Sequence, residues 1–343
     1  MSAPAAPLHA PVRPEWLALR SEPVIEPDLE IVDAHHHLWD RPGSSYLLPE
    51  LLADLGDGHH VVQTVFVQSR SMYRADGPEL YRPVGEVEFA NGVAAMSASG
   101  VYGASRACAG IVGCADLSLG EAVRPVIDAL KSAGNGRLRG IRFPVAYHED
   151  KRVLSTPAIS PPGLMLQPGF QAAAGVLAEE GLSLDIWAYH TQLAEVAALA
   201  RHVPGLNIVV DHCGGVIGVG SYAGRRDAAF SAWEQAVRPL AALPNVHVKI
   251  GGLGMRVVGF GFEDGKLPPT SEQLAGAWRP YVETCIELFG PERCMFESNF
   301  PVDKGAVGYR SLWNSFKRLT ASLSPPERSA LFAGTARRVY KLG

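Results

Sequence analysis

Eight short apolar segments recur along the chain, at intervals that leave room for a helix between most neighbours. Several of them are nearly continuous in Val, Ile and Leu, which is typical of parallel strands buried on both faces. The eight expected strands are Leu29–His35, Val61–Gln68, Ala107–Ala115, Leu138–Pro144, Ser183–His190, Asn207–His212, Asn245–Leu253 and Cys294–Pro301. Segments with helical periodicity separate most of them, at Leu119–Ala133, Gln192–Arg201, Ala228–Leu243 and Glu272–Phe289.

This eightfold alternation predicts an α/β fold, a single-domain (β/α)8 TIM barrel over residues 29–343 that follows an irregular N-terminal arm at residues 1–28. A doubly wound open sheet usually has fewer strands, and the GxGxxG fingerprint is absent after the first strand. Three long connections follow strands and are therefore expected at the carboxyl face of the barrel, where substrate is held. They are Ser69–Gly100, Tyr147–Gly169 and Phe260–Thr270.

Composition excludes several classes of function. The net charge is −4 and no run of Lys or Arg occurs, which argues against a nucleic-acid binder. No apolar run approaches the roughly 20 residues that span a bilayer, and the N-terminus does not resemble a secretory signal. The five cysteines show no CxxC spacing, so neither a disulfide framework nor a zinc knuckle is expected. We expect a cytoplasmic protein that acts on a small molecule.

Histidines follow the expected strands at three places. The first strand ends in Asp33-Ala34-His35-His36-His37, and strand alternation directs His35 and His37 into the barrel mouth. Two imidazoles on one face form half of a metal site. His190 and His212 end the fifth and sixth strands. Because the carboxyl ends of all barrel strands meet at one face, these four histidines are predicted to converge.

Seven segments with these histidines among them occur in a fixed order: DAHHHLWD, LRGIRFP, WAYHTQL, VVDHCGG, VHVKIGGLG, MFESNFPVD and LFAGTARRVYKL. Through them the chain resembles the amidohydrolase superfamily, in its family 2 branch of fuconolactonase-like sugar lactonases, pyrone-dicarboxylate lactonases and related decarboxylases. The resemblance extends from about Leu29 to the C-terminus. It is specific for the superfamily and much less specific for the substrate.

The resemblance implies that His35, His37, His190 and His212 belong to the active site. Either they hold one divalent metal ion, zinc or manganese, with His35, His37 and His190 as ligands, or they bind substrate and orient water without a metal. Arg142 matches an arginine that such enzymes direct at a substrate carboxylate or carbonyl, a task that suits a guanidinium. A salt bridge on the barrel rim is an equal alternative for Arg142.

The eighth strand departs from the superfamily pattern. Asn299 stands where an aspartate usually activates water, and a neutral amide cannot serve as a general base. Asp303 could reach back into the mouth, or Glu297 could replace the aspartate, because alternation places it on the same face as Asn299. A histidine is the third candidate base. The missing carboxylate also weakens a metal site, so the metal-dependent and metal-independent alternatives both stay open.

Further side chains are candidates for substrate contact. An inward-facing Lys249 would be a cation able to stabilise an oxyanion. Trp39, Tyr73 and Trp187 could form apolar walls, although each is also compatible with an ordinary core or rim position.

Hydrolysis of a lactone in a small carboxylated or sugar-derived molecule is the leading hypothesis. Decarboxylation is a second one, which Asn299 disfavours, and amide hydrolysis is a third. A non-catalytic binding protein on a degenerate barrel is disfavoured by the four histidines. A homodimer is compatible with such a barrel, and no segment of the sequence indicates an interface.

Overall fold

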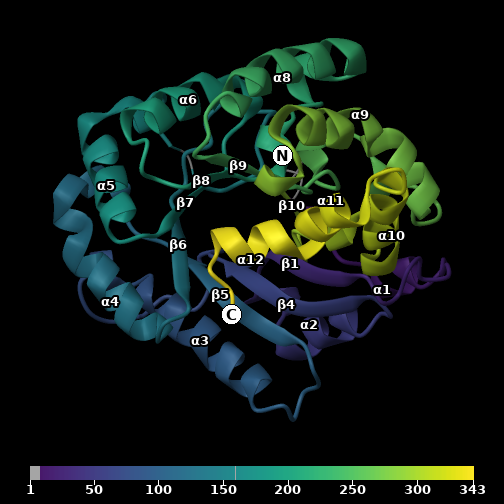
Figure 1. Ribbon diagram of the computed structural model, residues 1–343, viewed down its shortest axis with the longest axis horizontal. Coiled ribbons are helices and arrows are strands. Elements are labelled where there is room, and N and C mark those ends of the chain that lie inside the picture. The colour runs from purple at the N-terminus through teal and green to yellow at the C-terminus, as the bar shows by residue number, and fades with distance from the viewer. Residues whose placement is uncertain (1–7, 159) are drawn as a thin grey trace, which may run out of the picture.

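Eight parallel strands form the centre of the computed structural model, which describes residues 8–158 and 160–343 (Figure 1). They pair in the order β1-β4-β5-β6-β7-β8-β9-β10. Their bounds are β1 Glu30–His36, β4 His60–Val67, β5 Arg106–Gly113, β6 Leu138–Arg142, β7 Ser183–Ile186, β8 Ile208–Val210, β9 Val246–Ile250 and β10 Cys294–Phe296. A parallel bridge from His36 to Phe300 brings β1 beside the residues that follow β10. The predicted (β/α)8 barrel is confirmed.

Helices surround this sheet, as Figure 1 shows. The longer ones are α2 Leu48–Leu55, α3 Val84–Ala98, α4 Arg124–Gly134, α5 Pro168–Glu179, α6 Leu193–His202, α8 Arg226–Ala241, α9 Ser271–Phe289 and α10 Tyr309–Leu319. Short strands β2 (Trp39–Arg41) and β3 (Ser44–Tyr46) form an antiparallel hairpin after β1. No helix among the described residues is long and apolar enough to span a membrane.

The prediction of one long loop at Ser69–Gly100 is wrong for the second half of this segment, which forms helix α3 (Val84–Ala98). Its buried residues include Val84, Val87, Ala90 and Val93, which recur every three positions and pack toward the barrel. Small residues and an Asn-Gly pair in the middle of this segment weaken the helical signal that the sequence carries.

Strands β7 and β8 end earlier than the apolar runs in the sequence predicted. β7 ends at Ile186, so His190 lies four residues beyond it, in a short 3₁₀ helix (His190–Gln192). β8 ends at Val210, so His212 lies only two residues beyond its strand. This difference decides which histidine can reach the barrel mouth.

The described part of the N-terminal arm, residues 8–28, lies along the barrel and contains the short helix α1 (Pro14–Leu17). Trp16 Nε1 donates to the Gly265 carbonyl at 3.0 Å. Lys317 Nζ on α10 donates to the carbonyls of Ile25 and Glu26, each at 2.8 Å. These bonds fix the arm against the segments near β9 and β10.

The barrel interior changes in character from one end to the other. Val32, Val65, Val112, Val209 and Met295 form an apolar cluster with residues of the C-terminal helix α12 (Thr335–Val339). Toward the carboxyl ends of the strands the interior is polar, and its charged and imidazole side chains have no exposed surface. These are His35, Asp185, Asp211, Lys249 and Glu297.

Candidate active site

A cavity of about 150 Å³ opens at the carboxyl ends of the strands. Its polar lining includes His37, His212, Arg142 and Asn299. Apolar lining comes from Trp39, Trp187, Phe143 and Pro144, among others. The mouth of a TIM barrel is where its functional residues lie, so this cavity is the candidate active site.

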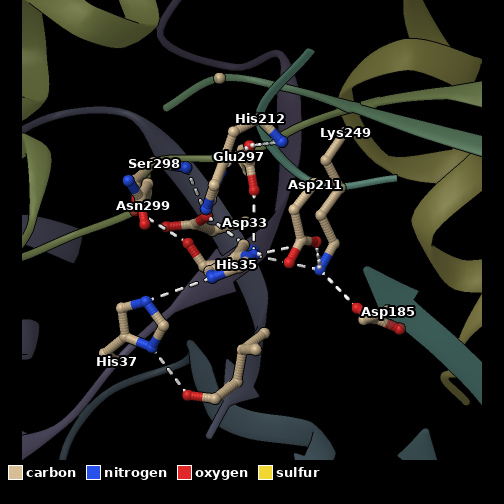
Figure 2. A network of polar contacts seen from close by, with 12 residues as sticks. Asp33, His35, His37, Asp185, Asp211, His212, Lys249, Glu297, Ser298 and Asn299 are labelled. Carbon is tan, nitrogen blue, oxygen red and sulfur yellow. Dashed lines mark hydrogen bonds and ion pairs between the residues drawn. The ribbon is translucent and has the colours of Figure 1, made fainter. Parts of the chain in front are cut away.

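His212 and Glu297 form a buried pair beside the cavity (Figure 2). His212 Nδ1 lies 2.7 Å from Glu297 Oε1, and the His212 backbone N–H donates to the same oxygen at 3.1 Å. Burial alone would raise the pKa of Glu297, but the adjacent His212 and His35 lower it to about 2. Glu297 is therefore a carboxylate, and His212 Nδ1 carries the hydrogen. His212 lines the cavity, so its Nε2 is left to face a ligand there.

His35 and His37 point toward each other at the end of β1. Their Nε2 atoms are 3.2 Å apart. His37 Nδ1 lies 2.8 Å from the Val67 carbonyl, so it carries the hydrogen and leaves Nε2 with a lone pair. Burial and the neighbouring His35 and Arg142 lower the pKa of His37 well below its usual value. The intervening His36 faces Thr64 instead, at 2.8 Å.

Lys249 has no exposed surface, and its Nζ lies beside His35 on the side away from His37 (Figure 2). Its Nζ is 2.7 Å from Asp185 Oδ2, 3.2 Å from Asp211 Oδ1 and 3.2 Å from His35 Nδ1. Burial acts to lower the pKa of Lys249, but the Asp185 and Asp211 carboxylates raise it overall. Lys249 is therefore a cation that supports His35 from behind, and it does not line the cavity.

Asn299 lines the cavity, and Asp303 lies behind it. Asn299 Nδ2 donates to Asp303 Oδ1 at 2.8 Å, while the Gly254 N–H donates to Asp303 Oδ2 at 2.8 Å. Asn299 Oδ1 is buried and accepts no hydrogen bond from any described residue. Burial raises the pKa of Asp303 to about 7. The Asn299 amide is thus fixed, with its oxygen still available as an acceptor.

The imidazole pair fits one divalent metal ion. Two nitrogens 3.2 Å apart can both lie about 2.1 Å from one zinc ion, and imidazole is a ligand that zinc accepts. A second group, His35, Asp211 and His212, has ligand atoms within 4.8 Å of one another. There the ammonium of Lys249 already contacts both His35 Nδ1 and Asp211 Oδ1. The Nε2 atoms of His35 and His37 are therefore the better donor pair, and Arg142 Nη1 lies 3.4 Å from the first of them.

Two predicted residues lie neither at the cavity nor among the buried polar groups behind it. His190 lies in another depression with Tyr222 and Arg201, and its Nε2 is 3.4 Å from the Tyr222 hydroxyl. Tyr73 is placed near Cys114 and Glu86, and these contacts and burial raise the pKa of Tyr73. Trp39 and Trp187 do line the cavity, as does Arg142.

Sequence reasoning missed four charged residues that shape the site. Asp185 and Asp211 interrupt apolar strand segments, and such an interruption was an available signal for a buried charge. Arg41 and Arg70 lie at the cavity mouth on the segments that follow β1 and β4. Nothing in local periodicity identifies them, because their place at the mouth depends on how the loops fold.

A family model described as amidohydrolase matches residues 32–342, nearly the whole barrel. The chain belongs to this amidohydrolase family. The matched region contains every site residue described above, from His35 at the end of β1 to Asp303 after β10.

Individual relatives cover most of the chain. It is 33% identical to the uncharacterized protein y4mH of Sinorhizobium fredii, over 92% of this chain and 99% of that protein. It is 26% identical to an L-fucono-1,5-lactonase of Burkholderia ambifaria, over 91% of this chain and 95% of that protein. An amidohydrolase from Burkholderia multivorans, crystallised with bound zinc, superposes with a TM-score of 0.70 and 25% identity, over 91% of this chain and 99% of that one.

Proposed function

We propose that this amidohydrolase opens a lactone ring by adding water to its carbonyl carbon. The observation that carries the proposal is the His212–Glu297 pair beside the cavity, with 2.7 Å between Nδ1 and Oε1. A neutral imidazole held by a carboxylate is a general base, which is what Asn299 cannot be. The similarity to an L-fucono-1,5-lactonase supports the choice of lactone over other carbonyl substrates.

In the proposed reaction, His212 Nε2 accepts a proton as water oxygen bonds to the lactone carbonyl carbon. The ring C–O bond then breaks, and the protonated imidazole returns the proton to the departing alkoxide. The products are a hydroxyl and a carboxylic acid on one open chain, and the acid ionises. Glu297 holds the imidazole in the correct tautomer and stabilises its positive charge while the proton is bound.

Arg142 is the proposed electrophile. Its Nη1 lies 3.3 Å from Asp211 Oδ2 and its Nη2 donates to the Gln68 carbonyl at 2.6 Å, so the guanidinium is fixed while it lines the cavity. A fixed cation beside the carbonyl oxygen stabilises the oxyanion that forms on attack. Asn299 Oδ1 would accept a hydrogen bond from water or substrate, and Asp303 positions that amide. Trp39 and Trp187 would flank the ring.

We further propose that His35 and His37 hold one divalent ion through their Nε2 atoms. The ion would supply Lewis-acid polarisation of the lactone carbonyl. His35 Nδ1 lies 3.0 Å from Glu297 Oε2. Donation of its hydrogen to that carboxylate would leave the Nε2 lone pair for the ion and fix the orientation of the imidazole.

The test is a pH-indicator hydrolysis screen over sugar lactones, muconolactones and pyrone carboxylates, with the metal content of the purified enzyme measured in parallel. We expect acid release from at least one class, lost in His212→Asn and retained in His190→Asn. His190 is the matched control, because it follows the neighbouring strand but does not line the cavity.

Folded enzyme that releases acid from none of these lactones would overturn the proposal. Carbon dioxide release from aromatic acids, or ammonia release from amides, would then identify decarboxylation or amide hydrolysis as the reaction of this barrel.

A further inference from the structure

The charged side chains at the cavity surface are all of one sign. Arg41, Arg70 and Arg142 line the cavity, and no Asp or Glu does so among the residues that the structure describes. Fixed charges of one sign around a concave surface attract ligands of the opposite sign. Arg142 faces Asp211 at 3.3 Å and is therefore partly compensated.

The backbone that carries Arg70 is held in place. Buried Glu86 on α3 accepts the N–H groups of Ser69 and Ser71 through one oxygen, each at 2.8 Å. Arg70, between them, has a φ of +60°, in the left-handed region that is uncommon for arginine. Such a backbone conformation persists only where the surroundings impose it, and here the two hydrogen bonds from Ser69 and Ser71 to Glu86 do so. The backbone at Arg70 is thus fixed, and it directs an exposed side chain to the cavity lining.

Arg41 is held beside it. Its guanidinium carbon lies 4.3 Å from the centre of the Trp39 ring, and its Nη2 donates to the Ser69 carbonyl. Burial and the neighbouring Arg70 lower the pKa of Arg41, against a smaller effect of Glu86 that raises it. The loop that presents Arg70 therefore also orients Arg41.

Within residues 8–158 and 160–343, neither guanidinium forms an ion pair with a carboxylate. The partner found for Arg41 is a backbone carbonyl, and no hydrogen-bond acceptor is found for Arg70. His9 of the N-terminal arm also lines the cavity, but burial and the charges of Arg41, Arg70 and Arg256 lower its pKa to about 4. His9 is thus neutral near pH 7. Two cations that line one cavity and form no direct ion pair with a carboxylate favour binding of an oxyanion.

We propose that Arg41 and Arg70 form a subsite for a carboxylate of the substrate, so that the preferred lactone is an acidic one. The inference rests on the proposed lactone hydrolysis and gives its substrate class. It separates this chain from its L-fucono-1,5-lactonase relatives, whose named lactone carries no carboxylate. A cavity of about 150 Å³ is of the size that encloses one six-membered ring, so the substrate is a small single-ring acid.

A matched pair of lactones tests the subsite: D-glucaro-1,4-lactone, which carries a carboxylate, and D-glucono-1,4-lactone, which does not. The quantity measured is the ratio of kcat/KM for the acidic lactone to that for the neutral one. We expect wild-type enzyme to favour the acidic lactone, and Arg70→Gln and Arg41→Gln each to lower the ratio roughly tenfold to a hundredfold, since hydrogen bonds to charged groups contribute on that scale. Arg124→Gln removes an exposed arginine that does not line the cavity, and it should leave the ratio unchanged.

Calorimetric binding of D-glucarate and D-gluconate to the same proteins separates failure of the subsite from failure of the lactonase proposal. Tighter binding of glucarate that Arg70→Gln abolishes supports the subsite even if neither lactone is hydrolysed. Hydrolysis of both lactones with a ratio that neither arginine variant changes overturns the subsite and leaves the lactonase proposal intact. Absence of selective glucarate binding, together with acid release from none of the lactones in the wider screen, overturns both.

Discussion

Strands β7 and β8 are neighbours, and each is followed by a histidine, but only one of these histidines reaches the cavity. His212 lies two residues beyond β8 with a φ of +56°, and Glu297 holds its Nδ1 at 2.7 Å. His190 lies four residues beyond β7, where its Nδ1 accepts the Ile217 N–H at 3.3 Å. Trp187, the first residue after β7, lines the cavity instead.

The difference between His190 and His212 indicates that two conditions must hold for a histidine after a barrel strand to enter the cavity. It must be close enough to the strand end to remain inside the ring of strands, and it must find a partner that fixes its inward rotamer. His212 meets both conditions through β8 and Glu297. His190 meets neither, and its nitrogens are used in local bonds to the loop and to Tyr222.

The largest expected effect is on turnover. His212→Asn should lower kcat by about 10² to 10⁴-fold, because a positioned general base contributes on that scale. His190→Asn should change kcat by less than about threefold, because His190 does not line the cavity and contacts no group proposed to take part in the reaction. Steady-state kinetics on the best lactone from the screen measure both. Equal losses of kcat in His212→Asn and His190→Asn would show that the two histidines do not differ in catalytic role, provided that both proteins retain the wild-type circular dichroism spectrum.

Lys249 joins the same two strands inside the barrel, where Asp185 of β7 and Asp211 after β8 both contact it. Lys249→Met leaves two buried carboxylates without this cation, and losing one partner of a buried ion pair costs about 3–5 kcal/mol of unfolding free energy. Urea denaturation measures the change. The double variant Lys249→Met/Asp185→Asn should be less destabilised than Lys249→Met alone, because one unpaired charge is then removed. A loss under about 1 kcal/mol in the single variant would contradict the role assigned to Lys249.

Glu297→Gln tests what directs His212 inward. The amide removes the charge that stabilises a protonated imidazole and can present an N–H to Nδ1, so kcat/KM should fall roughly tenfold to a hundredfold. The His212 imidazole is still present in this variant, so the change in kcat/KM reports how Glu297 orients and stabilises it. Glu287→Gln on α9 serves as a surface control that changes the same functional group. Unaltered kcat/KM in Glu297→Gln would show that the pair is only structural.

The smallest effect concerns the pH dependence of stability at His190. Burial lowers the pKa of His190 from 6.5 to about 4 in the folded protein. Between these values the unfolded chain binds the proton more readily, so stability is lost as the pH falls from about 7 to 5. The part due to His190 is about 2 kcal/mol at pH 5. His190→Gln should therefore lose about that much less stability than wild type over this interval in urea denaturation, and an identical loss in both proteins would show that His190 is not buried in neutral form.

Much of the architecture could be predicted from the amino-acid sequence. Continuous Val and Ile runs mark strands buried on both faces, and eight of them separated by helical segments leave little alternative to a barrel. The inward direction of His35 and His37 also follows from the sequence, because side chains two apart on a strand share a face. Helix α3 (Val84–Ala98) was missed, since small residues and Asn91-Gly92 dilute its apolar periodicity.

Only the tertiary structure decided which side chains meet at the cavity. Whether His190 or His212 enters it depends on where a strand ends and on a partner 85 residues away, Glu297. Lys249 on β9 pairs with Asp185 on β7 and with Asp211 after β8. Ser69 accepts a hydrogen bond from Arg41 through its carbonyl, and its N–H is held by Glu86. Local sequence sets the period and burial of an element, because those depend on neighbours a few residues away. Which charged groups pair with one another depends on distances between residues far apart in the sequence, and the folded barrel sets these distances.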